Sequence, residues 1–440
     1  MHAILFCLLA STTNAADTWS DVSPIISRHC STCHHDAGSG PFPLLSHSDL
    51  AGRRRFIAEI LRRKLMPPWL PGGDSPPLHD DRTMPKTDRS RLIAWLDAGA
   101  PTAEGTEPVA ITPPITPSFP AGTFTVPLDE PFVIPPETIE NEHRFHQDTW
   151  CFVIPLDNED PLRVRGIGWK TAAPQSVHTV TLVADDRGRG RKRDEVDPRV
   201  GFERDGDLDR DISGSLGGVG IGLDRMLLPP GFHWSIPAHS DLVAEVKYRP
   251  LGRALPLGDQ AYLVPADDVA SREVIAVVTG VNRLKVPAGE KEHEAEDRFT
   301  LPAAFDVIAV IPRARNECRS MRLSANLPDG TQRTLLDIPD WDAHFRRPYL
   351  FKSIQSLPAG TILVSRFIID NTDGNPRNPY DPPEDLRIGR RTGVAGFTLL
   401  GAGSDAAASN LLLKTSQRVM DRRGSQTRPS RTPIPSPKAP

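Results

Sequence analysis

Proline is so frequent in this chain that long helices are excluded from most of it. The 440 residues include 45 prolines, about twice the average share of roughly 5%. A proline inside a helix removes one backbone hydrogen bond and clashes with the preceding turn. Beyond about the first hundred residues, few stretches carry the apolar repeat of an amphipathic helix. We therefore expect a multidomain protein, with a small helical part followed by a larger part built from β-strands.

The helical part, a small all-α domain, is predicted at residues 17–102. The segment Asp49–Lys64 repeats apolar residues along one helix face, and Thr87–Ala98 starts with a residue that can cap a helix. Residues 103–122 are rich in proline and poor in large apolar side chains, so we interpret them as a linker.

Short apolar runs separated by Gly, Pro, Asp and Asn dominate after this linker, and Asp241–Tyr248 is one example. Many short strands with such punctuation are typical of β-sandwiches. The stretch is long enough for two all-β, jelly-roll-like sandwich domains, which we place at residues 123–270 and 271–402. Residues 403–440 lose this periodicity and become rich in Arg, Ser and Pro, so we predict a disordered tail.

The N-terminus is typical of a cleaved secretory signal peptide, which we place at residues 1–15. It is apolar from Ala3 to Ala10 and ends in small residues. We therefore expect a periplasmic or secreted protein. No apolar run approaches about 18 residues, so we predict no membrane span. The formal net charge of -4 gives no reason to expect a nucleic-acid partner.

The five cysteines are too few for a disulfide framework. Cys7 lies in the predicted signal, and Cys30 and Cys33 form a close pair. Cys151 and Cys318 fall in different predicted sandwiches. They form either a disulfide, which an oxidising compartment allows, or two separately buried thiols.

The motif Cys30-Ser31-Thr32-Cys33-His34 predicts one covalently attached haem c. Two cysteines on one turn can form thioethers with the two vinyl groups of a haem, and the following histidine then presents its imidazole to the iron. A zinc half-site or a redox dithiol also uses a Cys-x-x-Cys pair. However, no second cysteine pair completes a zinc site, and no βαβ pattern surrounds the motif. We predict Cys30, Cys33 and His34 as haem-binding residues.

A second iron ligand has to come from later in the chain. Met66 follows a predicted helix, and the next two prolines keep its backbone extended. Thioether ligation raises the reduction potential and suits electron transfer. Met84 is the rival, because it precedes a predicted helix, and core packing is the alternative for either methionine. We predict His34 and Met66 as the metal ligands.

Four runs of this sequence resemble one family: Cys30–His34, Gly40–Leu44, Met66–Trp69 and Trp95–Pro101. They are similar to the small cytochrome c domain found in front of copper type II, ascorbate-dependent monooxygenase-like domains in bacteria. In that family the methionine of the Met-Pro-Pro-Trp run is the distal ligand. The resemblance therefore implies Met66 here.

The remainder of the chain resembles the peptidylglycine hydroxylating monooxygenase fold, in which two β-sandwiches each carry one copper. The matching landmarks are turn and scaffold residues: Val177–Val180, Leu228–Gly231, Leu242–Pro250, Leu327–Gly330, Trp341, Tyr349, Leu357–Thr361, Asp370-Asn371 and Asn375–Pro379. We expect these sandwiches to bind a small-molecule or peptide ligand.

The copper ligands that this resemblance implies are nearly all missing. The His-His pair of the family is His178-Thr179 here, and its later strand histidine is Lys247. Its His-x-His falls in residues 312–316 and its methionine in residues 393–396, and neither segment contains His or Met. Redox-active copper needs about three neutral nitrogen or sulfur donors. We therefore expect no copper.

The sequence thus predicts a secreted c-type cytochrome that exchanges electrons with a redox partner protein and carries a copper-depleted monooxygenase-like binding module. The alternative is a haem-fed copper-dependent monooxygenase, a hydroxylating oxidoreductase, with copper on ligands that the family pattern does not include. Two accidental histidine pairs, His143 with His146 and His233 with His239, are the weak metal pairs that remain.

Overall fold

The computed structural model describes residues 17–113, 118–128, 132–136, 148–203, 215–266, 271–281, 283–388 and 395–425. The chain divides into two compact units. The first, called here the helical unit, runs up to Trp69 and resumes at Arg82. The second, the β unit, takes Leu70–Asp81 and the chain from Ser118 onward. The predicted signal peptide and the pair His143 and His146 lie outside the described residues.

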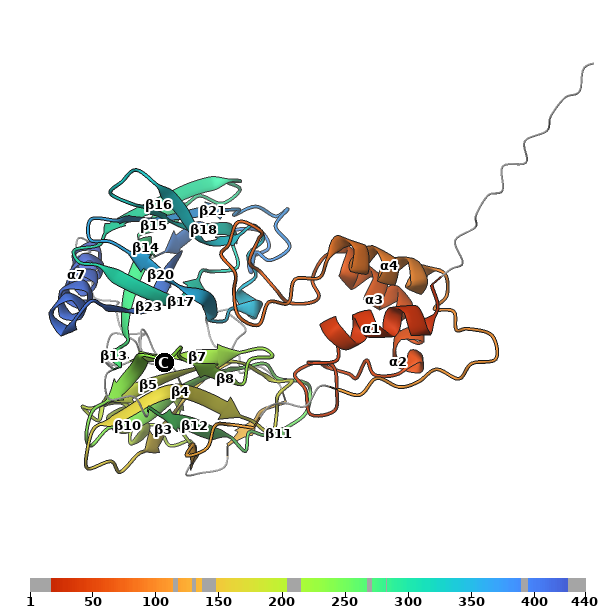
Figure 1. Cartoon of the computed structure of the whole chain (residues 1–440), viewed down its shortest axis with the longest axis horizontal. Coiled ribbons are helices and arrows are strands. Elements are labelled where there is room, and N and C mark those ends of the chain that lie inside the picture. The colour runs from red at the N-terminus through yellow and green to blue at the C-terminus, as the bar shows by residue number, and fades with distance from the viewer. Residues whose placement is uncertain are drawn as a thin grey trace, which may run out of the picture. The chain divides into compact units, whose positions relative to one another are not determined.

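The helices of the helical unit form one small core (Figure 1). They are α1 (Trp19–His29), α2 (His47–Ala51), α3 (Arg54–Arg62) and α4 (Lys86–Asp97). Helix α1 begins with a capping box. The Thr18 amide donates to Asp21 Oδ2 at 2.8 Å, and the Asp21 amide donates to Thr18 O at 3.0 Å. The Trp19 and Trp95 rings, 6.0 Å apart between centroids, join α1 to α4. The expected helix Asp49–Lys64 is two shorter helices that separate at Gly52.

The β unit is mostly β-sheet, consistent with the expected β-sandwiches (Figure 1). The first sandwich pairs a 6-stranded sheet with a 5-stranded sheet. The first of these sheets contains β1 (Phe124–Pro127), β12 (Gln260–Pro265), β4 (Leu162–Lys170), β9 (Phe232–Ile236), β13 (Arg272–Glu273) and β8 (Arg225–Leu227). The second contains β6 (Phe202–Glu203), β3 (Asp148–Pro155), β10 (Asp241–Tyr248), β5 (Val177–Asp185) and β7 (Ser215–Gly220). Side chains from both sheets share one buried cluster. A short helix and a two-stranded ribbon accompany these sheets: α5 (Arg189–Asp194), β2 (Val133–Ile134) and β11 (Leu255–Pro256).

The second sandwich pairs two 4-stranded sheets. One has the order β14 (Ile275–Val281), β23 (Ala395–Gly403), β17 (Phe305–Arg313) and β20 (Tyr349–Leu357). The other has the order β16 (His293–Thr300), β21 (Ile362–Ile369), β18 (Cys318–Asn326) and β19 (Gln332–Ile338). The Phe367 and Phe397 rings stack at 5.7 Å between centroids and join the two sheets. A 3-10 turn and a further ribbon complete the sandwich: η1 (Ala343–Phe345), β15 (Leu284–Val286) and β22 (Leu386–Ile388).

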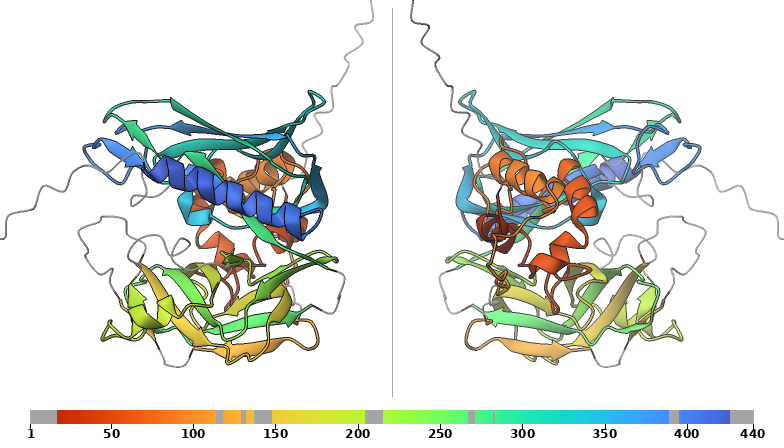
Figure 2. Two further views of the ribbon diagram at one scale, coloured as in Figure 1. Left: turned by 90° about the vertical axis from the view of Figure 1, so that its left-hand side faces the viewer. Right: turned by 90° about the vertical axis from the view of Figure 1, so that its right-hand side faces the viewer.

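The C-terminal prediction of disorder is wrong for residues 406–425, which form the helix α7 (Ala406–Ser425). Figure 2 shows α7 lying along the sheet that contains β14 and β23. Leu412 is fully buried, and the hydroxyl of Ser416 accepts from the Val278 amide at 2.9 Å. The polar composition hid these contacts, which supply the burial that a disordered segment lacks. Residues 426–440 are outside the described part.

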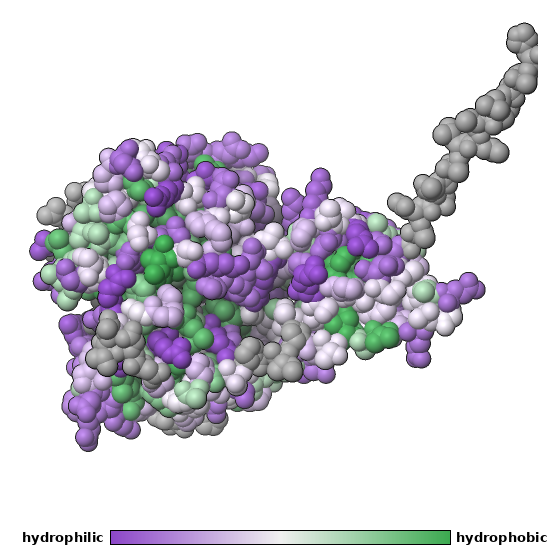
Figure 3. All heavy atoms as spheres, in the orientation of Figure 1, coloured by the Kyte–Doolittle hydropathy of each residue, from purple (hydrophilic) through white to green (hydrophobic). Residues whose placement is uncertain are grey.

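On the visible face of the β unit, hydrophobic residues are scattered among hydrophilic ones (Figure 3). Within the described ranges, no helix is both long enough and apolar enough to cross a membrane.

Candidate functional site

Cys30 and Cys33 lie on one turn at the end of α1. The Cys30 amide donates to Ile26 O at 2.8 Å, and the amides of Cys33 and His34 both donate to Cys30 O, at 3.1 and 3.0 Å. Neither thiol is in a disulfide. Burial, and then the neighbouring Cys33, raises the pKa of Cys30 to about 12. The Arg82 guanidinium donates to Cys33 Sγ at 3.6 Å. The two sulfurs therefore lie on one turn with no disulfide between them.

His34 is held in one orientation directly after these thiols. Its Nδ1 lies 2.9 Å from Phe42 O. Because a carbonyl can only accept, Nδ1 carries the proton and the lone pair of Nε2 is left for another partner. Burial lowers the pKa of His34 and outweighs the opposing hydrogen bond to Phe42. A neutral imidazole with a free Nε2, fixed through Nδ1, is the form in which histidine binds a metal.

A glycine-rich loop folds back over the motif. Gly40 donates its amide to Cys33 O at 2.8 Å. A Cβ at Gly40 would lie 2.6 Å from His34 Nδ1, and one at Gly38 would lie 2.1 Å from Cys33 O. Only glycine fits at either position. The two unbridged thiols and the oriented imidazole, held by this close loop, form a donor set that fits a covalently attached haem.

The two candidate methionines have different surroundings. Met84 is only 6% exposed and belongs to the apolar core of the helical unit, so its environment matches core packing. Met66 is half-buried and lies outside that core cluster. Its carbonyl accepts from Arg89 Nη1 at 3.0 Å, and the same guanidinium donates to Leu61 O at the end of α3. Arg89 therefore ties the backbone of Met66 to the helical unit.

The positions expected for copper ligands come together in space but carry the wrong side chains. Thr179 on β5 lies directly opposite Lys247 on β10. Arg313 on β17 lies opposite Gly396 on β23. None of these four residues supplies a soft neutral donor, because Thr179 offers a hydroxyl, Lys247 and Arg313 are cations, and Gly396 has no side chain. Among the described residues, no group of three or more His, Cys, Asp or Glu side chains is arranged to hold a metal.

His178 is the one copper-ligand position that keeps a histidine. Burial, followed by the nearby His344, Arg249 and Lys247, lowers its pKa to about 4. Its Nδ1 is buried, with no hydrogen-bond partner in the described part of the chain. The His344 ring lies 6.4 Å away between centroids, at 68°. His233 Nδ1 lies 3.0 Å from Ser271 Oγ, and within the described ranges His233 and His239 belong to no group of three or more possible metal ligands.

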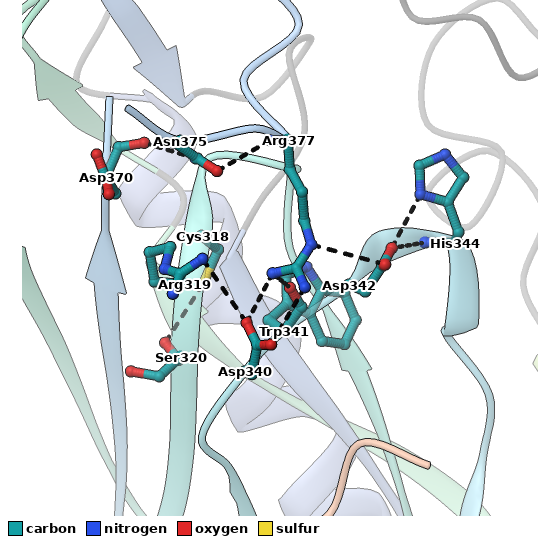
Figure 4. Close-up of polar contacts among 10 residues, drawn as sticks. All are labelled: Cys318, Arg319, Ser320, Asp340, Trp341, Asp342, His344, Asp370, Asn375 and Arg377. Atoms are coloured by element: carbon teal, nitrogen blue, oxygen red, sulfur yellow. Dashed lines mark hydrogen bonds and ion pairs between the residues drawn. The ribbon is translucent and has the colours of Figure 1, made fainter. Parts of the chain in front are cut away.

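His344 was missed as a candidate from the sequence, although a local signal was present. Asp342 accepts from both the amide and Nδ1 of His344, each at 2.9 Å (Figure 4). Burial pushes the pKa of Asp342 up, but the hydrogen bonds from His344 and the charge of Arg377 keep it below its usual range. The spacing Asp-x-His is a local pattern that can orient an imidazole.

The landmark residues of the second sandwich build the polar cluster around this aspartate (Figure 4). Arg377 donates to Asp340 Oδ1 at 2.7 Å and to Trp341 O at 2.8 Å. The Arg377 amide donates to Asn375 Oδ1 at 3.0 Å, and the Asn375 side chain donates to Asp370 O at 2.8 Å. These residues therefore have a scaffolding role that orients the segment before His344.

The remaining cysteines do not pair. Cys151 on β3 and Cys318 on β18 are both buried and both free. The Cys318 thiol donates to Ser320 O at 3.3 Å, and burial raises the pKa of Cys318 to about 12. The disulfide alternative is therefore wrong. Each thiol is buried within its own sandwich, Cys151 in a small apolar cluster with Val183, Phe202 and Val243, so packing explains its presence.

No family model and no curated protein matches the chain. The solved structure of PNGF-II is 10% identical with a TM-score of 0.28, and the match covers 64% of this chain and 66% of that one. The major capsid protein P2 from bacteriophage PM2 is 8% identical with a TM-score of 0.27, covering 64% and 99%. Both scores are too low to support an argument about fold or function.

Proposed function

We propose that this protein is a c-type cytochrome with one haem attached to Cys30 and Cys33, and with His34 and Met66 as axial ligands. The observation that carries the proposal is the single turn that joins two unbridged thiols to an imidazole whose Nδ1 is bonded to Phe42 O. A bound haem c would supply single-electron chemistry. The helical unit would then be the cytochrome domain, and the predicted signal agrees with a periplasmic or secreted location.

The residues around the motif have definable tasks in this proposal. Phe42 O fixes the tautomer of His34, and burial keeps the imidazole neutral. Arg89 holds the backbone of Met66. The environment of Met84 in the core supports Met66 as the second ligand. A thioether ligand favours the reduced state and raises the potential, which suits electron transfer.

The start of α3 is the surface that we propose for the redox partner. Arg53, Arg54 and Arg55 follow one another, and the Phe56 side chain beside them is 56% exposed. The Arg53 guanidinium lies 4.7 Å from the Phe42 ring centroid, and that ring lies 5.4 Å from the His34 ring. A cationic face thus lies next to the proposed axial ligand in a chain whose net charge is -4. An acidic electron-transfer protein fits it.

The β unit is proposed to be a monooxygenase-like binding module without catalytic copper, for a small-molecule or peptide ligand. The register of Thr179 with Lys247, and of Arg313 with Gly396, supports a scaffold that keeps the ligand positions but not the ligands.

The test of the central proposal is covalent haem. Protein made with a haem-attachment system should keep its colour through denaturing electrophoresis, and the double variant Cys30→Ser with Cys33→Ser should lose it. Cys151→Ser is the matched control and should stay coloured. In the ferric protein, a weak near-infrared sulfur-to-iron band should disappear in Met66→Ala and persist in Met84→Ala. A colourless wild-type protein would refute the proposal.

The second candidate function is a haem-fed copper monooxygenase, and the facing rings of His178 and His344 are the observation that favours it. Two imidazoles fall short of the roughly three donors that cycling copper needs. Metal analysis of the purified holoprotein separates the two functions. We expect one iron per chain and negligible copper, whereas stoichiometric copper after dialysis against a mild chelator would support the monooxygenase.

A further inference from the structure

Leu70–Asp81 belongs to the β unit, although the residues on both sides of it belong to the helical unit. We call this segment the strap. In Figure 1 it is the orange loop beside the blue-green strands of the second sandwich. The chain therefore leaves the helical unit after Trp69, docks on the sandwich, and returns at Arg82.

The first half of the strap is fixed to β19. The Gly72 amide donates to Asp337 O at 2.7 Å, and the Asp337 amide donates to Ser75 Oγ at 3.0 Å. Arg322 donates to Asp337 Oδ1 at 2.8 Å and to Asp74 Oδ2 at 2.6 Å. Because β19 ends the order of its sheet, the strap occupies an edge that would otherwise be open.

The second half is fixed to β20, which ends the order of the other sheet. Leu78 forms an antiparallel bridge with Phe351 and is only 3% exposed. The Lys352 amide donates to Pro77 O at 2.9 Å, and the His79 amide donates to Leu350 O at 2.8 Å. The strap thus joins the edge strands of both sheets by backbone hydrogen bonds, as in β-strand addition.

An ion pair with one buried partner closes the strap. Arg347 donates to Asp80 Oδ2 at 2.6 Å. The arginine side chain is 5% exposed, whereas that of the aspartate is 43% exposed. The arginine is therefore the buried partner, and a charge-assisted bond of this kind is stronger than a neutral one.

The residues that border the strap belong to the proposed haem site. Met66-Pro67-Pro68-Trp69 leads directly into it, and two of these residues are prolines that restrict the backbone. Arg82 follows it directly and donates to Cys33 Sγ. Because a docked strap has few conformations, the loop that carries Met66 loses less entropy when its side chain is bound.

We propose that the second sandwich positions the axial methionine through the strap, and that Arg347 is a positioning residue for Met66. This inference rests on the proposed function. Its consequence is that a ligand or partner that loosens β19 or β20 weakens the bond between Met66 and iron, and lowers the reduction potential. The sandwich would thereby regulate the electron carrier to which it is fused.

The experiment uses ferric and ferrous holoprotein of Arg347→Met, which removes the buried cation from the pair with Asp80, whose side chain is 43% exposed. We expect the near-infrared band to weaken, the midpoint potential to fall, and the apparent affinity for added imidazole to rise about tenfold. Covalent haem content should not change. Arg347→Lys, which keeps the charge, should restore part of the band. The matched control is Arg366→Met, which removes an exposed ion pair with Glu296 on the same sandwich and should behave as wild type.

A second variant tests the same proposal in case Arg347→Met does not fold. Asp74→Asn releases the other end of the strap, and its carboxylate is 63% exposed, so the sandwich should fold and the same changes should be smaller. If the wild type shows the sulfur-to-iron band and the folded variants keep its intensity, potential and imidazole affinity, the positioning role is refuted while the cytochrome stands. A wild type without covalent haem refutes both.

Discussion

The carboxyl group of Asp259 should make the first sandwich less stable as the pH rises through neutrality. Asp259 is 3% exposed, and its Oδ2 accepts the indole N–H of Trp169. Burial raises its pKa from 3.8 to about 8, against the opposing hydrogen bonds from Thr171 and Trp169. The folded chain therefore keeps a proton that the unfolded chain releases. The stabilising contribution is complete below pH 3.8 and is lost as the pH rises toward 8.

The magnitude follows from the interval between the two pKa values. Between 3.8 and about 8, each pH unit costs the folded state about 1.4 kcal/mol relative to the unfolded state. Asp259→Asn cannot ionise, and its amide oxygen can still accept the indole N–H of Trp169. The free energy of unfolding of this variant minus that of the wild type should therefore increase by about 3 kcal/mol from pH 5 to pH 7.

Urea denaturation at pH 5, 6, 7 and 8, followed by tryptophan fluorescence, measures this difference. Asp197→Asn is the control. The hydrogen bond and charge of Arg199 lower the pKa of Asp197 to about 2, so its contribution is lost only as the pH falls toward that value. Its stability difference from wild type should be constant from pH 5 to 8. A constant difference for Asp259→Asn as well would show that Asp259 is ionised in the folded protein and refute the reasoning.

Three further predictions concern thiols, the tail and the loop. Cys151 and Cys318 should both react with a thiol reagent in denatured, unreduced protein and neither in the native state; one bridge would leave both unlabelled. Leu412→Ala should lower the free energy of unfolding by about 2–5 kcal/mol. Leu411 is 47% exposed, so Leu411→Ala should change this free energy little; equal effects of the two variants would contradict the docking of α7. Gly40→Ala should cost about 1–3 kcal/mol and reduce haem incorporation, measured by absorbance per chain, and unchanged incorporation would contradict the tight packing of the loop on the axial imidazole.

Features that depend on neighbouring residues could be predicted from the sequence. The motif Cys30–His34 forms its turn through hydrogen bonds within five consecutive residues. The strand expected at Asp241–Tyr248 is confirmed as β10 with the same bounds. The general division into a helical part and a larger β part also followed from proline frequency and apolar spacing, because both act locally on the backbone. The family resemblance and the haem itself stay predictions.

Features that depend on distant partners could be recognised only in the tertiary structure. Ser416 of α7 bonds to a residue 138 positions away, and Asp80 of the strap pairs with a residue 267 positions away. Composition alone predicted disorder for the tail and had no signal for the strap, because a polar segment is ordered only when a folded surface elsewhere supplies its hydrogen bonds and covers its few apolar side chains. His344 shows both cases. Asp342 orients its ring through local hydrogen bonds. The contact between the His344 and His178 rings, however, requires strands that meet only after both sandwiches have folded.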